Sequence, residues 1–138
     1  MNILETIIAE KEIEVSRQKA LFPFAVLEQS EFFNRKTFSL KEFLLDETKT
    51  GIIAEFKRKS PSKGIINDRS DVVDVTKAYT ANGASCLSVL TDEIFFGGTA
   101  ADLKSARVNN IPILRKDFII DEYMVYEAKI LGADAILL

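Results

Sequence analysis

Three charged residues end apolar runs of this sequence, at a spacing that could support chemistry. Glu55 and Lys57 end the run that starts at Gly51, and Lys116 ends the run at residues 111–116. In a strand, residues i and i+2 point to the same face, so Glu55 and Lys57 share one face. An ammonium beside a carboxylate can bind an anionic ligand or donate a proton to a reacting group. These residue types therefore indicate a candidate catalytic group made of Glu55, Lys57 and Lys116.

A short polar segment, Ser60-Pro61-Ser62-Lys63-Gly64, follows soon after Lys57. Its hydroxyls and backbone N–H groups can face an anion. Plainer interpretations stay open for each of these features. The charged residues can belong to a solvated edge strand, or to ion pairs with only a structural role. The serines can simply form a turn.

The composition excludes several classes of protein. The chain has 138 residues, which suggests one domain, and its net charge of -3 argues against a nucleic-acid partner. No apolar run approaches the roughly 20 residues of a membrane span, and the N-terminus lacks the features of a secretion signal. There is no histidine, which excludes Ser-His, Cys-His and His-ligated zinc chemistry. The single cysteine, Cys86, is predicted to be buried in a protein of the reducing cytoplasm.

Short apolar runs alternate with amphipathic segments along the chain. We predict a first helix at residues 3–20, ended by Pro23, and a short helix from Ser39 to Leu45. Residues 24–37 receive no assignment. The elements predicted after them are a strand from Gly51, helix 71–82, strand 86–90, helix 99–110, strand 111–116, helix 121–131 and strand 135–138. This alternation predicts βαβ units and a parallel sheet, hence the α/β class.

Four parallel strands by themselves would leave two long apolar sheet edges unpaired. We therefore interpret the chain as the first half of a larger fold. Leu137 and Leu138 are predicted to be core residues. In barrels of eight βα units the active site lies at the C-terminal ends of the strands, where the three charged residues are expected.

Four stretches of the sequence resemble strand motifs of the indole-3-glycerol-phosphate synthase family, in the same order and spacing. They are residues 53–64, 87–98, 111–121 and 132–138, and the leading helix resembles that family's N-terminal extension. The resemblance implies a (β/α)8 TIM barrel that acts as a carboxy-lyase of tryptophan biosynthesis. Residues 1–48 would be its N-terminal helical extension, and residues 49–138 would be strands 1 to 4, the first half of the barrel. The implied reaction is ring closure, decarboxylation and dehydration of 1-(2-carboxyphenylamino)-1-deoxyribulose 5-phosphate, with no metal or organic cofactor.

The resemblance also implies a role for each candidate residue. Lys116 would be the general acid that protonates the ribulose carbonyl. Lys57 would hold the substrate's carboxylate or phosphate, and Glu55 would orient Lys57 and the anilino nitrogen. The implied substrate-binding residues are Ser60, Pro61 and Ser62, which would shape the anthranilate pocket, and Phe96 and Phe118, which would form its apolar walls. The alternative for the two phenylalanines is that they are ordinary core residues.

Two other functions stay open at this point. The family's strands five to eight supply a further glutamate, an asparagine and the phosphate site, so the 138-residue chain alone is expected to be inactive. A non-catalytic half-barrel module that self-associates through its exposed sheet edges is one alternative. Another phosphate-binding barrel, such as phosphoribosylanthranilate isomerase, is the second, although the runs at residues 57–62 and 115–118 argue against it.

Overall fold

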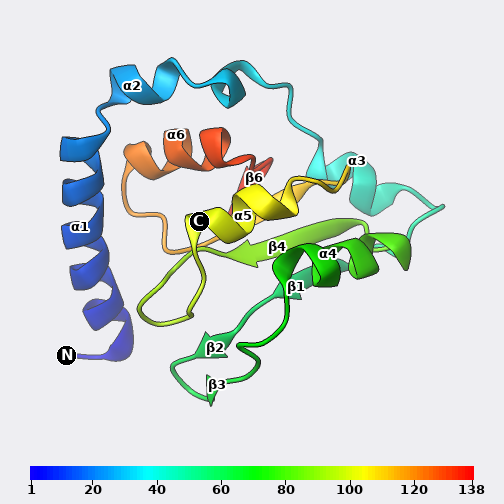
Figure 1. The fold of residues 1–138 in the computed structure, drawn as a ribbon, viewed down its shortest axis with the longest axis horizontal. Helices are drawn as coiled ribbons and strands as arrows, with labels where there is room; N and C mark the ends of the chain where they lie inside the picture. The colour runs from blue at the N-terminus through cyan, green and yellow to red at the C-terminus, as the bar shows by residue number, and fades with distance from the viewer.

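Helices and strands alternate in the computed structural model, which describes residues 1–138 (Figure 1). In chain order the elements are α1 (Ile3–Leu21), α2 (Phe24–Glu28), the 3-10 helix η1 (Glu31–Asn34), α3 (Leu40–Leu45), β1 (Ile53–Phe56), β2 (Lys59–Ser60), β3 (Gly64–Ile65), α4 (Val72–Ala81), β4 (Cys86–Leu90), α5 (Ala100–Ala106), β5 (Ile113–Lys116), α6 (Glu122–Leu131) and β6 (Ala135–Ile136). The strands β1, β4, β5 and β6 form one parallel sheet in that order. The predicted βαβ units are confirmed.

Alternate residues of the sheet face opposite sides, and the helices α4, α5 and α6 cover only one of them. On the covered side, Leu87, Val89 and Ile113 are fully buried and belong to one core with Leu103 of α5 and Ala128 of α6. The charged candidates lie on the other side, because Glu55 pairs in register with Ser88 and Ser88 with Leu114, two residues before Lys116. This side of the sheet is where a barrel has its interior.

The segment before β1 wraps around the covered sheet. Figure 1 shows α2 and η1 lying over α6, while α1 runs upward along the left side of the molecule to α2. Helix α1 begins with a capping box between Asn2 and Glu5, and it buries one stripe of residues, Ile7, Lys11 and Val15. Val15 packs in a second small core with Tyr123 of α6. Residues 24–37, for which we made no prediction, thus contain α2 and η1.

Local hydrogen bonds begin most of the predicted helices. Asp71, Thr99 and Asp121 each accept a backbone N–H at the start of α4, α5 and α6. Ser39 does the same for α3 by accepting from the N–H of Glu42. Such contacts join residues two or three positions apart, which is why the sequence could predict them.

The prediction that Leu137 and Leu138 are core residues is wrong. Leu137 is 45% exposed and Leu138 is 98% exposed, and β6 ends at Ile136. The reason is that β5 pairs with one edge of β6 while no strand of this chain pairs with the other edge. No helix has the combination of length and apolar composition that crossing a bilayer requires.

Candidate active site

The carboxylate of Glu55 lies between the two predicted lysines. Its Oε2 is 3.5 Å from Nζ of Lys116, and its Oε1 is 3.8 Å from Nζ of Lys57. These distances are longer than those of hydrogen bonds, typically about 2.7–3.2 Å, so both ammonium groups keep donors for a ligand. The three side chains are 30–40% exposed. The expected meeting of Glu55, Lys57 and Lys116 is confirmed, and their chemical roles remain a prediction.

Ser88, which was not among the predicted site residues, joins this group. Its hydroxyl donates a 2.9 Å hydrogen bond to Oε2 of Glu55. Ser88 is the central residue of β4 and is buried. A signal was present, because Ser88 is the one polar residue in the run at residues 86–90. The hydroxyl fixes one oxygen of Glu55, which leaves the other oxygen facing Lys57.

An apolar cavity of about 350 Å³ opens beside Lys116 at the same end of the sheet. The rings of Phe96 and Phe118, both predicted as walls, line it with their centroids 6.1 Å apart. The other lining residues, which we did not predict, are Ile8, Leu90, Asp92, Asp117, Ile119, Ile120, Leu137 and Leu138. A cavity with apolar walls and one ammonium at its edge suits an aromatic ring that carries a polar substituent.

The loop that carries Phe96 folds back tightly over the end of β4. A Cβ on Gly98 would lie 2.1 Å from the carbonyl oxygen of Leu90, so no other residue fits there without a shift. Oδ2 of Asp92 accepts the backbone N–H of Phe95 at 2.8 Å and that of Phe96 at 3.3 Å. Gly98 and Asp92 therefore hold Phe96 beside the cavity.

The predicted serine segment does not line this cavity. Ser60 and Gly64 belong to the small antiparallel pair of β2 and β3. Oγ of the buried Ser60 accepts the N–H of Lys63 at 3.2 Å and lies 3.4 Å from Oγ of Ser62, whereas Pro61 and Ser62 are exposed. These contacts are those of a turn, and a role of Ser60, Pro61 and Ser62 in substrate binding remains a prediction.

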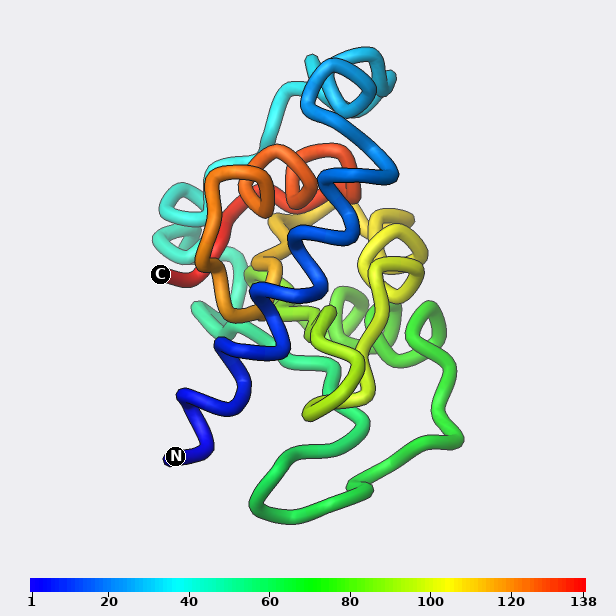
Figure 2. Tube along the Cα trace, turned by 90° about the vertical axis from the view of Figure 1, so that its left-hand side faces the viewer, coloured from blue at the N-terminus to red at the C-terminus, as the bar shows by residue number.

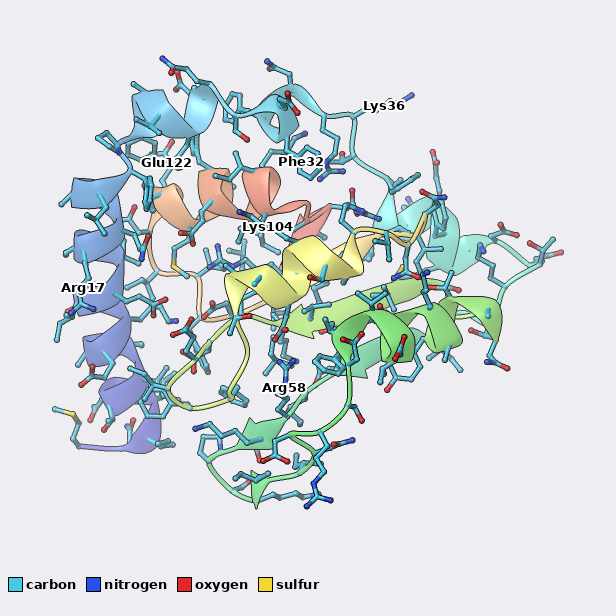
Figure 3. All side chains as sticks on the ribbon, viewed as in Figure 1. Arg17, Phe32, Lys36, Arg58, Lys104 and Glu122 are labelled. Carbon is cyan, nitrogen blue, oxygen red and sulfur yellow. The ribbon has the colours of Figure 1, made fainter.

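Arg58 anchors the segment between Lys57 and the β2–β3 pair. Its guanidinium makes a two-armed ion pair with Asp102 of α5, with Nη2 3.0 Å from Oδ1. Its guanidinium carbon also lies 4.8 Å from the ring centroid of Phe56. Figure 3 shows Arg58 at the end of β1, below α5. This double contact restrains the backbone next to Lys57.

A buried group of charges supports the cavity from the side of α1. Nζ of Lys11 lies 2.9 Å from Asp92, 3.0 Å from Asp117 and 2.8 Å from Glu14. Burial acts to lower the pKa of Lys11, but the carboxylates of Asp117, Glu14 and Asp92 outweigh it and hold the pKa above its ordinary value. Lys11 therefore stays charged, although it is 1% exposed.

Sequence reasoning missed Lys11, for which a signal was available. It occupies the middle of the stripe formed with Ile7 and Val15 at intervals of four residues, where an apolar residue is expected. A charge on the buried stripe of a helix requires partners, and those partners lie far along the chain.

Cys86 is buried, as predicted. Burial and the nearby carboxylate of Asp134 raise the pKa of its thiol to about 11, so the reactive thiolate is scarce at neutral pH. No three His, Cys, Asp or Glu side chains are arranged to hold a metal ion.

Comparison with known proteins decides the family. The sequence pattern of indole-3-glycerol phosphate synthase matches residues 4–138. The chain belongs to the indole-3-glycerol phosphate synthase family. The predicted resemblance is therefore confirmed, and the alternative of a phosphoribosylanthranilate isomerase is not supported.

Several curated relatives carry the name indole-3-glycerol phosphate synthase. The protein from Bacteroides thetaiotaomicron is 49% identical over 138 residues, which cover 99% of this chain and 53% of that protein. The relative from Carboxydothermus hydrogenoformans is 43% identical, with 98% and 54% covered, and that from Legionella pneumophila strain Paris is 45% identical, with 99% and 53% covered. The chain thus spans about half the length of the curated relatives it matches. Its four parallel strands agree with half of the family's TIM barrel.

Proposed function

We propose that this chain contributes to the indole-3-glycerol phosphate synthase reaction. The substrate would be 1-(2-carboxyphenylamino)-1-deoxyribulose 5-phosphate, which closes its ring, loses carbon dioxide and eliminates water. One observation carries the proposal: Lys116 lies at the boundary between an apolar cavity with two aromatic walls and the charges of Glu55 and Lys57. The substrate has the same division, since an aromatic ring is joined to a phosphorylated sugar.

In this proposal each side chain has a defined role. The aromatic ring enters the cavity between Phe96 and Phe118, and the ribulose carbonyl then faces Nζ of Lys116. Lys116 donates a proton to the carbonyl oxygen as the ring carbon forms the new bond. Lys57 binds the anionic group, the carboxylate or the phosphate. Glu55 orients Lys57 and the anilino nitrogen, and Ser88 orients Glu55.

The apolar walls also favour loss of carbon dioxide. A carboxylate is stabilised by water, so a site that excludes water weakens this stabilisation relative to the transition state. Eight of the eleven residues around the cavity are hydrophobic. Decarboxylation is therefore the step that the cavity, rather than the charged group, would assist.

The test uses the half of the barrel that the relatives carry beyond the matched region. We expect the 138-residue chain alone to show little or no turnover. Residues 1–138 joined to the remaining part of the Bacteroides thetaiotaomicron relative should form indole-3-glycerol phosphate, measured by product fluorescence and released carbon dioxide. A well-folded fusion without turnover would refute the proposed function. Turnover by the chain alone near the rate of intact relatives would refute its expected inactivity.

A second candidate is a self-associating half-barrel without catalysis. The observation that favours it is the exposure of apolar side chains at both edges of the sheet. At the β1 edge, Ile52 and Ile53 are 57% and 41% exposed, and beyond β6 Leu137 and Leu138 are 45% and 98% exposed. A stable dimer in light scattering, together with an inactive fusion, would favour this module. A cytoplasmic location is expected for either function.

A further inference from the structure

The N-terminal helix α1 reaches the two loops that carry the cavity's aromatic walls. In Figure 2, α1 runs diagonally across the loops that follow β4 and β5. Ile8 of α1 lines the cavity, and three residues later Lys11 enters the buried charges beneath it. The helix is thus in direct contact with the candidate site, although it precedes the first strand by many residues.

Lys11 joins two aspartates, and each aspartate also holds the backbone of an aromatic wall. Oδ1 of Asp92 contacts Lys11 while its Oδ2 accepts the N–H of Phe96. Oδ1 of Asp117 contacts Lys11 and also accepts the N–H of Phe118 at 2.8 Å. One ammonium group is therefore connected to both walls through a single intermediate residue on each side.

Other side chains also contact Asp117, whereas Asp92 has only backbone N–H groups as partners besides Lys11. Oδ2 of Asp117 accepts a 2.6 Å hydrogen bond from Thr91 and lies 3.4 Å from Arg115. Lys11 is the only cation that contacts Asp92. Without Lys11, the buried carboxylate of Asp92 would have no opposite charge, and the loop at residues 91–98 would have to move to reach water.

We infer that Lys11 is a positioning residue, which sets the separation of Phe96 and Phe118 and so shapes the pocket for the aromatic ring. The consequence for ligand binding rests on the proposed function, since it assumes that the cavity takes an anthranilate-type ring. The consequence for the loops does not rest on it. Lys11 contacts neither ring and acts through Asp92 and Asp117.

Amide hydrogen exchange of the 138-residue chain tests the loops without any ligand. In Lys11→Met the N–H groups of Phe96 and Phe118 should exchange at least about tenfold faster relative to the N–H of Leu87 in β4, because a tenfold change needs only about 1.4 kcal/mol. Lys11→Arg should keep the ratios. Lys19→Met is the matched control: it removes a lysine of the same helix, whose partner is Asp121, and the ratios should not change.

Unchanged ratios in Lys11→Met would overturn the inference, since a merely structural lysine would affect Leu87 and the loops alike. If Lys11→Met does not fold, Lys11→Gln provides the test. The shorter amide can reach one aspartate but not both, so one of the two phenylalanine N–H groups should lose protection. Equal protection of both in Lys11→Gln would again contradict the inference.

Binding of N-methylanthranilate, a fluorescent ring with the substrate's amine and carboxylate, tests the pocket. Lys11→Met should weaken binding roughly tenfold, and Lys11→Arg and Lys19→Met should bind like the unsubstituted chain. Equal binding by Lys11→Met and the unsubstituted chain would refute the role in shaping the pocket. If the unsubstituted chain does not bind this probe while the exchange ratios change, the cavity is not the binding site of the aromatic ring and the positioning of the loops stands.

Discussion

Two groups of charges lie at the same end of the sheet and differ in their exposure to water. The open cluster, Glu55, Lys57 and Lys116, has side chains 30–40% exposed and ion pairs of 3.5 and 3.8 Å. In the buried cluster, Lys11, Asp92 and Asp117, no side chain is more than 3% exposed and the ion pairs are 2.9 and 3.0 Å. The same charged groups, ammonium and carboxylate, therefore occur both partly exposed and fully buried.

The contrast is sharpest at two adjacent residues of the chain. Lys116 ends β5 on the open side of the sheet, and Asp117 turns to the opposite side, where Thr91, Arg115 and Lys11 surround it. A buried charge must be matched by fixed partners, because removing it from water is costly. A partly exposed charge can exchange its partner for a ligand at little cost. We conclude that burial, rather than residue type, separates the groups available for chemistry from those that hold the fold.

The largest effect is expected for the open cluster's general acid. In the active fusion, Lys116→Met should lower kcat by about 10²–10⁴-fold, the usual contribution of a positioned proton donor. The urea unfolding free energy should change by less than about 1 kcal/mol, because the side chain is partly exposed. Lys104→Met, which removes an exposed lysine of α5 labelled in Figure 3, is the control and should leave both quantities unchanged. A full kcat in Lys116→Met would exclude this role.

A substitution in the buried cluster should, in contrast, have a large effect on the unfolding free energy. Asp117→Ala removes the common partner of Lys11, Thr91 and Arg115, and we expect a loss of about 3–5 kcal/mol of unfolding free energy in urea. Asp68→Ala, at an exposed position without an ion pair, should cost less than about 0.5 kcal/mol. A similar small loss in both variants would show that burial does not distinguish the two clusters.

Lys57 should affect binding more than turnover. A hydrogen bond to a charged group contributes about 1.5–3 kcal/mol, so Lys57→Met should raise KM of the active fusion roughly tenfold to a hundredfold. We expect kcat to change less, since Lys57 holds an anionic group and does not transfer the proton. Lys63→Met, an exposed lysine of the neighbouring turn, is the comparison. If kcat falls and KM does not, Lys57 takes part in the chemical step instead.

Removal of a surface ion pair should have the smallest effect on the unfolding free energy. This pair is the reference with which both clusters can be compared. Lys19 lies 2.6 Å from Asp121, and this hydrogen bond, with that from the N–H of Tyr123, lowers the pKa of Asp121. Because the pKa of Asp121 is lower in the folded state, the pair stabilises the fold fully at pH values above the ordinary carboxyl pKa of roughly 3.9. This stabilisation is lost as the pH falls through the lower pKa of the folded state.

Asp121→Asn isolates this contribution because asparagine can still cap α6. The unfolding free energy of the unsubstituted chain should exceed that of Asp121→Asn by at most about 1 kcal/mol at pH 7, since the pair is partly exposed. Urea titrations should show that the difference shrinks below about pH 4. A difference that grows with acid would contradict the assigned direction.

The sequence by itself determined the order of the elements and the face on which the catalytic candidates lie. Periodicity and helix caps depend on residues at most a few positions apart, so the alternation of strands and helices was readable, as were Asp71, Thr99 and Asp121 at helix starts. The two-residue repeat of a strand placed Glu55 and Lys57 together. Parallel strands align at one edge, which added Lys116.

Only the tertiary structure decided what surrounds those candidates. The cavity combines Ile8 of α1 with residues at or after the ends of β4, β5 and β6. The partners of Lys11 lie in loops that are distant from it in sequence. It also showed that Leu137 and Leu138 are exposed, because no strand pairs beyond β6. Burial is a property of the assembled layers rather than of a residue's neighbours in sequence. That is why the open cluster could be predicted, whereas the partners of Lys11 in the buried one could not.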